Sequence, residues 1–122
     1  MPDTLLVRTL GDIKEIDAHA WDTLNAQSGG SMLTSHGFLQ AFEQSQSVCP
    51  DTGWQPQHLL VQGETSQALV AAIPLYAKGH SYGEFVFDWA WADAYRRAGL
   101  RYYPKWLCGV PFTPVTSARL LC

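Results

Sequence analysis

The sequence predicts an α+β protein in which a mixed, mostly antiparallel sheet packs in layers with helices. The main observation is a pair of strand-like segments, His58 to Gln62 and Gln67 to Tyr76, joined by a polar turn. Segments with helical spacing or helix caps precede and follow this pair. The expected order along the chain is therefore strand, helix, helix, hairpin, helix, strand. At 122 residues the chain fits a single domain, 1–122.

Short local patterns predict the first two elements. Thr4 to Leu10 is an apolar run with β-branched members, which is typical of a strand. Asp12 is followed three residues later by Glu15, the spacing of a capping box. We therefore expect a helix to begin at Asp12 and to run to about Gln27.

Caps and prolines predict the limits of the later elements. Ser35 should cap a second helix, which the Cys49-Pro50 pair should end. Pro74 lies late in the second hairpin strand and cannot donate a ladder hydrogen bond, so an edge or a bulge is expected there. Asp88 should cap a third helix that stops at Gly99.

Composition and charge exclude several classes of protein. With 47% hydrophobic and 16% charged residues the chain should be globular, and its net charge of -3 disfavours binding to DNA phosphates. The longest nearly apolar run, Ala68 to Ala77, is half of the roughly 20 residues that a membrane span requires. The first residues lack the pattern of a secretory signal. Cys49, Cys108 and Cys122 lie far apart, which favours reduced thiols in a cytoplasmic protein.

Motifs for several common chemistries are absent from the sequence. His19, His36, His58 and His80 stand singly, without the spacing of a metal site, so no bound metal is expected. The sequence has no G-x-S-x-G nucleophile turn, phosphate-binding loop or dinucleotide fingerprint.

The densest chemistry lies in the predicted third helix and its flanks, "KGHSYGEFVFDWAWADAYRRAGLRYYPK". Helical spacing brings one set of side chains to one face, Trp89, Asp93, Arg96 and Arg97, and a second set to another, Trp91, Tyr95 and Ala98. Two interpretations are equally compatible with this pattern. The segment is either a core helix with a solvated Asp93 to Arg97 pair, or the wall of a cleft. In the cleft, stacking surface and polar groups would come from Trp89, Tyr82, Tyr102, Tyr103, Asp88, Asp93, Glu84 and Arg96.

A resemblance to a known family extends over nearly the whole chain. The segment "HSYGEFVFDWAWADAYRRAGLRYYPKWLCGVPFTPVTSARLL" resembles the signature region of the FemAB-like peptidoglycan biosynthesis or recognition proteins, a group related to the GNAT acyltransferases. Upstream, "SMLTSHGFLQAFEQSQSV", "GWQPQHLLV" and "LVAAIPLYAKGHSYGE" resemble the same family in the same order. The resemblance covers the N-terminal half of these longer proteins.

This resemblance implies a partial GNAT-like fold and transfer of an acyl or aminoacyl group to an amine linked to a peptidoglycan precursor. The catalytic residues would be His80 and Glu84, one or the other accepting a proton from the acceptor amine. The substrate-binding residues would be Ser81, Tyr82, Asp88, Trp91, Asp93, Arg97, Tyr103 and Lys105. In GNAT proteins the donor site lies in the second half, so no cofactor is expected in this chain. A full-length protein would use acyl-coenzyme A or an aminoacyl donor.

A second class of function remains open at this point. The aromatic segment would equally suit a non-catalytic recognition or interaction module. In that case a partner chain, as in an oligomer, or the missing C-terminal half would complete the sheet, because open strand edges favour such pairing.

Overall fold

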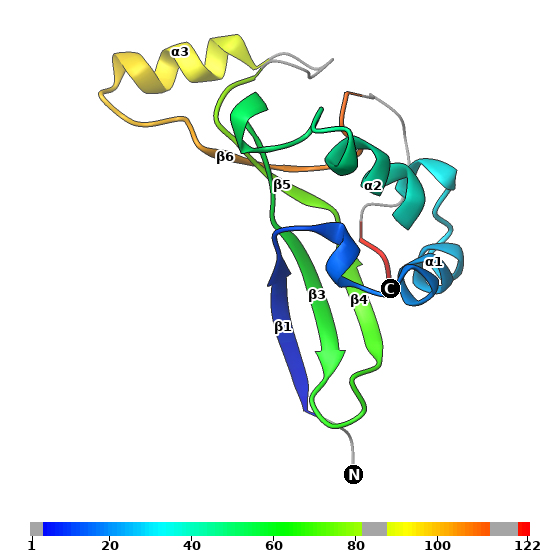
Figure 1. Cartoon of the computed structure of the whole chain (residues 1–122). Helices are drawn as coiled ribbons and strands as arrows, with labels where there is room; N and C mark the ends of the chain where they lie inside the picture. The colour runs from blue at the N-terminus through cyan, green and yellow to red at the C-terminus, as the bar shows by residue number, and fades with distance from the viewer. Residues whose placement is uncertain (1–3, 82–87, 113–119) are drawn as a thin grey trace.

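The structure, a computed structural model, describes residues 4–81, 88–112 and 120–122. Two three-stranded sheets form in these ranges, and every strand pair in them is antiparallel. The first sheet has the order β1 (Leu5–Leu10), β3 (His58–Gly63) and β4 (Leu69–Ile73), as Figure 1 shows. This arrangement confirms the α+β class, with two small sheets in place of the one expected.

The second sheet has the order β2 (Trp54–Pro56), β5 (Leu75–Lys78) and β6 (Lys105–Cys108). It continues the first sheet, because β2 leads directly into β3 and β4 leads directly into β5. At the junction the amide of Gln57 donates to the carbonyl of Leu75 at 2.9 Å.

Pro74 explains why the sheets divide. The sequence predicted one strand from Gln67 to Tyr76, and the structure has two shorter strands that meet at this proline. Because proline has no amide hydrogen, the ladder cannot continue through it. The consecutive strands β2–β3 and β4–β5 together form a long hairpin. Each half of this hairpin pairs with a different third strand, β1 below the junction and β6 above it (Figure 1).

The first helix begins later than its capping pattern predicted. Asp12 caps only a short 3-10 turn, Ile13–Glu15, and accepts from the amide of Lys14 rather than closing a capping box with Glu15. The helix α1 spans Ala18–Gln27 and is capped by Asp17, which accepts from the amide of Ala20 at 3.0 Å. The extended residue between the two caps, Ile16, is buried in the core, and this burial interrupts the helical path.

Ser35 caps α2 (His36–Gln44) as predicted, but this helix ends before Cys49-Pro50. Gln46 adopts a left-handed backbone conformation with φ +64°, which turns the chain after α2 and carries Val48 into a buried site. The expected stop instead begins a separate 3-10 turn, Pro50–Thr52.

The third helix, α3 (Trp89–Arg97), stops as its glycine predicts, with Gly99 at φ +75°. Asp88 occupies the N-cap position, yet its side chain makes no capping hydrogen bond. The carboxylate is directed to other partners, described below.

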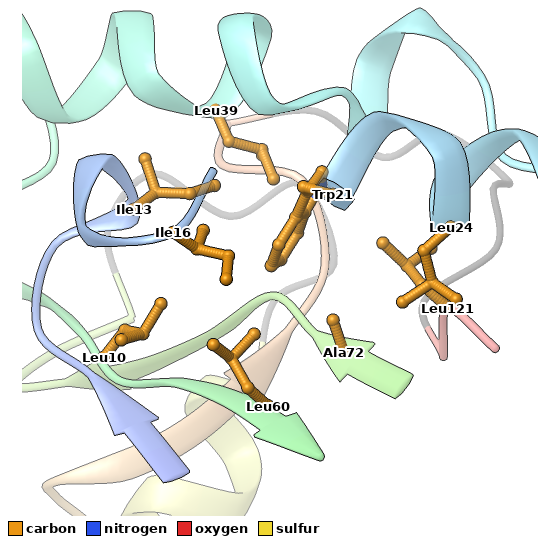
Figure 2. Close-up of a cluster of buried hydrophobic side chains, with 9 residues drawn as sticks. All are labelled: Leu10, Ile13, Ile16, Trp21, Leu24, Leu39, Leu60, Ala72 and Leu121. Atoms are coloured by element: carbon orange, nitrogen blue, oxygen red, sulfur yellow. The ribbon is translucent and has the colours of Figure 1, made fainter. Parts of the chain in front are cut away.

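The main core lies between the first sheet and the helices α1 and α2. Figure 2 shows Trp21, Leu24 and Leu39 directed from the helices toward Leu60 and Ala72 on the sheet. The full cluster is Leu10, Ile13, Ile16, Trp21, Leu24, Leu39, Leu60, Ala72 and Leu121. A smaller cluster of Val48, Trp54 and Tyr76 lies beside the second sheet.

Helix α3 lies outside both clusters. It projects beyond β6 in Figure 1, and none of its residues is buried. Within the described ranges, no helix is long and apolar enough to cross a membrane.

Candidate substrate cleft

A pocket of about 450 Å³ opens along one face of α3. The helix contributes residues one turn apart, since side chains three and four positions apart share a face. After Gly99 reverses the chain, the segment that leads to β6 forms the opposite wall. We call this the α3 pocket; it is lined by Trp89, Ala92, Asp93, Arg96, Leu100, Arg101, Tyr102 and Tyr103.

Aromatic rings give the α3 pocket its apolar surface. The ring of Tyr102 packs edge to face against Tyr95 from the helix and against Tyr103, with centroids 5.1 Å apart in each pair. Trp89 lines the other wall and is 43% exposed, so part of its indole remains open to a ligand. Such half-exposed rings suit stacking against an apolar or planar group.

A polar cluster extends from the two tyrosines of the pocket. The hydroxyl of Tyr102 donates to Asp88 Oδ2 at 2.5 Å, and the hydroxyl of Tyr103 lies 2.6 Å from Ser81 Oγ. Lys105 Nζ donates to Ser81 Oγ at 3.0 Å and also pairs with Asp88 Oδ2. We call these five residues the Asp88 cluster. It joins the end of β5, the start of α3 and the start of β6.

The cluster holds Asp88 ionised and Tyr102 neutral. Burial alone raises the pKa of Asp88, but hydrogen bonds from Lys105, Ser81 and Tyr102 and the positive charge of Lys105 outweigh it, so the pKa falls to about 2. The hydrogen bond to Asp88, aided by burial, raises the pKa of Tyr102 to about 12. Asp88 Oδ1 is buried and has no hydrogen-bond partner within the described part of the chain.

The carboxylate of Asp93, which lines the pocket, forms salt bridges with two arginines. Arg96 Nη2 lies 2.5 Å from Asp93 Oδ1, and Arg97 Nη2 lies 2.7 Å from Asp93 Oδ2. The predicted Asp93 to Arg97 pair is thus present, and a second arginine joins it. Only Arg96 of the two arginines also lines the pocket.

His80 forms a hydrogen bond with a residue outside the Asp88 cluster. Its Nε2 lies 2.8 Å from the carbonyl oxygen of Thr52, so this nitrogen carries a proton and donates it. Gly53 makes the close approach possible, because a Cβ on it would lie 2.3 Å from His80 Nε2. A proton-accepting role for His80 would therefore use Nδ1.

The structure gathers some of the predicted site residues and separates others. Asp93 and Tyr103 line the α3 pocket, while Ser81, Asp88 and Lys105 meet in the cluster next to it. Trp91, which is 68% exposed, and Arg97 do not line the pocket. The expected substrate contact Tyr82 and the expected base Glu84 fall outside the described residues.

Sequence reasoning missed part of the second wall. Leu100 and Arg101 line the pocket, yet they follow a helix stop and had been given no role. The available signal was Gly99 itself, because a left-handed stop reverses the chain and returns the following residues toward the helix.

The α+β fold thus carries an aromatic pocket beside an ionic cluster, and a family comparison gives the class of protein. Residues 12–122 match the model of the FemAB-like family, which is described as peptidoglycan biosynthesis/recognition. The chain belongs to this family, as the quoted segments indicated. It is thereby assigned to peptidoglycan biosynthesis or recognition. No curated protein and no solved structure matches the chain.

Proposed function

We propose that this chain is the acceptor-binding half of a transferase that moves an acyl or aminoacyl group to an amine of a peptidoglycan precursor. The supporting observation is that Tyr102 and Tyr103 belong to both the α3 pocket and the Asp88 cluster. A ligand against the aromatic wall would therefore lie next to fixed charged groups. Family membership supplies the link to peptidoglycan.

The proposed reaction is nucleophilic acyl transfer. The acceptor nitrogen attacks the acyl carbonyl carbon, the carbon-nitrogen bond forms, and the carbon-sulfur or carbon-oxygen bond to the leaving group breaks. The amine loses one proton to a base, and the leaving thiol or hydroxyl takes up a proton. We assign the base to His80, through Nδ1, or to Glu84.

The proposal gives this chain the acceptor and not the donor. An acyl-coenzyme A or aminoacyl donor would be held outside the α3 pocket, in the second half of a GNAT-type fold. The proposed location is the cytoplasm, where thiols stay reduced. Within the described residues, none of Cys49, Cys108 and Cys122 forms a disulfide.

Binding and transfer can be tested separately. The chain should bind a peptidoglycan precursor peptide, and Trp89→Ala should weaken that binding by up to about tenfold, from the ~0.5–1.5 kcal/mol typical of aromatic contacts in proteins. Trp91→Ala, a tryptophan outside the pocket on the same helix, is the matched control. Equal losses in both variants would remove the α3 pocket as the acceptor cleft.

Transfer is best measured in a longer FemAB-like homologue by the mass added to the acceptor amine. Alanine at the positions of His80 and Glu84 should lower the rate by about 10²-fold or more for the residue that acts as the base. Alanine at the position of His19, an exposed helix residue, should leave the rate unchanged. Full turnover in both the His80 and the Glu84 variants would eliminate these residues as bases.

One observation favours the alternative of a non-catalytic interaction module. Trp91 and Trp106 are 68% and 64% exposed, a degree of exposure that suits contact with a protein partner. This module would form a stable oligomer or bind a partner chain through these two rings. Sedimentation at low concentration decides the oligomer case, since a strictly monomeric chain excludes self-assembly.

A further inference from the structure

We propose that the α3 pocket recognises its ligand through an anionic group, a carboxylate or a phosphate, that binds Arg96 and Arg101. The aromatic wall of Trp89 and Tyr102 would hold an apolar or planar part of the same ligand. This inference deepens the proposed function and rests on it only for calling the ligand an acceptor. Binding of the anion does not require any transfer reaction.

The first argument is the balance of charge at the pocket. Its lining residues include two arginines, Arg96 and Arg101, and one carboxylate, Asp93. That carboxylate is already shared, because one oxygen pairs with Arg96 and the other with Arg97. The two guanidinium groups that line the pocket outnumber its one carboxylate, and Arg97, outside the pocket, also offsets the charge of that carboxylate. The chain as a whole carries a net charge of -3, so this surplus is local.

The second argument is the availability of donors. Each guanidinium has five N–H donors, and the contact with Asp93 uses only part of the set on Arg96. Arg101 forms no hydrogen bond or ion pair with any other residue in the described ranges. The two arginines lie on opposite walls, one on the helix and one on the returning segment. An anion between them would receive charge-assisted hydrogen bonds from both sides.

The third argument is that the carboxylates near the pocket already form ion pairs with basic side chains. Asp88, the carboxylate of the adjacent cluster, is paired with Lys105 and accepts from Tyr102. It therefore adds little repulsion toward a ligand anion. Asp93 acts as a positioning residue, since its salt bridge with Arg96 holds that guanidinium beside the pocket.

The shape of the site agrees with a small amphipathic anion. A volume of about 450 Å³ lies within the range of small-molecule sites. Five of the eight lining residues are aromatic or aliphatic, namely Trp89, Ala92, Leu100, Tyr102 and Tyr103, so a purely ionic ligand would leave this surface uncovered. The expected ligand class is therefore an anion attached to an apolar or ring-bearing group.

Three probes distinguish the possible sources of the anion. Phenyl phosphate presents a phosphate, N-acetylphenylalanine presents a carboxylate, and N-acetylphenylalaninamide is the neutral counterpart of the second. Titration of the whole chain by calorimetry should show at least one of the two anions binding about tenfold or more tightly than the amide. Phosphate-only or carboxylate-only binding supports the proposal and names the source. Equal affinity for the amide and both anions overturns it.

A matched set of arginine variants locates the site. Arg101→Gln and Arg96→Gln should each weaken anion binding by about tenfold, as expected for a lost hydrogen bond to a charged group. Arg97→Gln removes the same charge from the same helix outside the pocket, and should change affinity less than about threefold. Equal losses in all three variants would mean general attraction to a basic surface and would overturn the proposal.

The outcome stays separable from that of the proposed function. All three arginines are exposed, so these variants should fold, and circular dichroism checks this. If anions bind selectively but none of the full-length FemAB-like homologues transfers an acyl group, only the transferase proposal fails. If transfer proceeds equally well to acceptors without an anionic group and no anion selectivity is found, only the present inference fails.

Discussion

The two halves of the long hairpin differ in how many buried apolar side chains surround them. Around the first sheet, nine buried side chains close a continuous apolar core beneath α1 and α2 (Figure 2). Around the second sheet, the buried set is small and includes a charged residue, Lys78, whose ammonium lies 3.8 Å from the centroid of the Trp54 ring. Helix α3 buries nothing. The half around the first sheet therefore stabilises the fold, whereas the half around the second sheet carries the aromatic and charged side chains of the candidate site.

A buried hydrogen-bonded pair connects these halves at the Pro74 break. The amide of Leu75 donates to His58 Nδ1 at 3.2 Å, which requires the proton of the neutral ring to be on Nε2. That nitrogen donates to Glu43 Oε2 at 2.9 Å, and Glu43 Oε1 accepts from the amide of Ile13 at 2.9 Å. Both sheets and α2 are thereby held together by polar contacts inside the protein.

The largest expected difference between the halves is in their tryptophans. Trp21 is fully buried and donates to the carbonyl of Thr34 at 3.0 Å, so Trp21→Ala should cost about 3–5 kcal/mol of unfolding free energy. Trp91→Ala, at an exposed site on α3, should cost no more than about 0.5 kcal/mol. Urea denaturation measures both. Similar losses would contradict the division into a half that stabilises the fold and a half that carries the candidate site.

The junction should contribute less than the core. His58→Leu leaves the amide of Leu75 and a carboxylate oxygen of Glu43 without partners, so a loss of about 1–3 kcal/mol is expected. His19→Leu, on the exposed side of α1, is the control and should stay within about 0.5 kcal/mol. If both histidine variants unfold at the wild-type denaturant concentration, the buried pair does not hold the two sheets together.

The contribution of the Asp88 cluster to the free energy of unfolding should depend on pH in the acidic range. The pKa of Asp88 is about 2 in the folded protein against an ordinary 3.8, so the folded state favours the ionised form. Its contribution is complete above pH 3.8 and is lost as the pH falls through 2. Asp88→Asn should flatten the fall in thermal unfolding temperature within this window. Asp51→Asn, on the exposed 3-10 turn, should keep the wild-type slope.

The smallest expected signal comes from Tyr102. Its pKa of about 12, against an ordinary 10.0, means that the folded state favours the neutral phenol. The associated stability is complete below pH 10.0 and is lost as the pH rises through 12. An alkaline titration followed by ultraviolet absorbance should lose the tyrosinate step near pH 12 in Tyr102→Phe, whereas Tyr76, whose pKa burial raises well above 10.0, is unaffected. The Tyr95→Phe variant should keep that step.

Sequence reasoning succeeded where a feature depends on neighbours within one turn of the chain. Ser35 caps α2 and Gly99 stops α3 because such caps are decided by residues three or four positions away. The same local logic failed at Asp12, where two equivalent caps, Asp12 and Asp17, competed. Burial of Ile16 in the core between them decided that α1 begins at the second cap.

The sequence by itself determined the α+β class, the first strand, the Ser35 cap, the Gly99 stop and the FemAB-like family, because hydrophobic period, turn chemistry and family motifs are all present along the chain. Only the tertiary structure decided which side chains meet in the Asp88 cluster. Ser81 meets Tyr103 across 22 residues and Lys105 across 24. Such contacts depend on how Pro74 divides the sheet and how Gly99 reverses the chain, and no local pattern specifies the resulting distances.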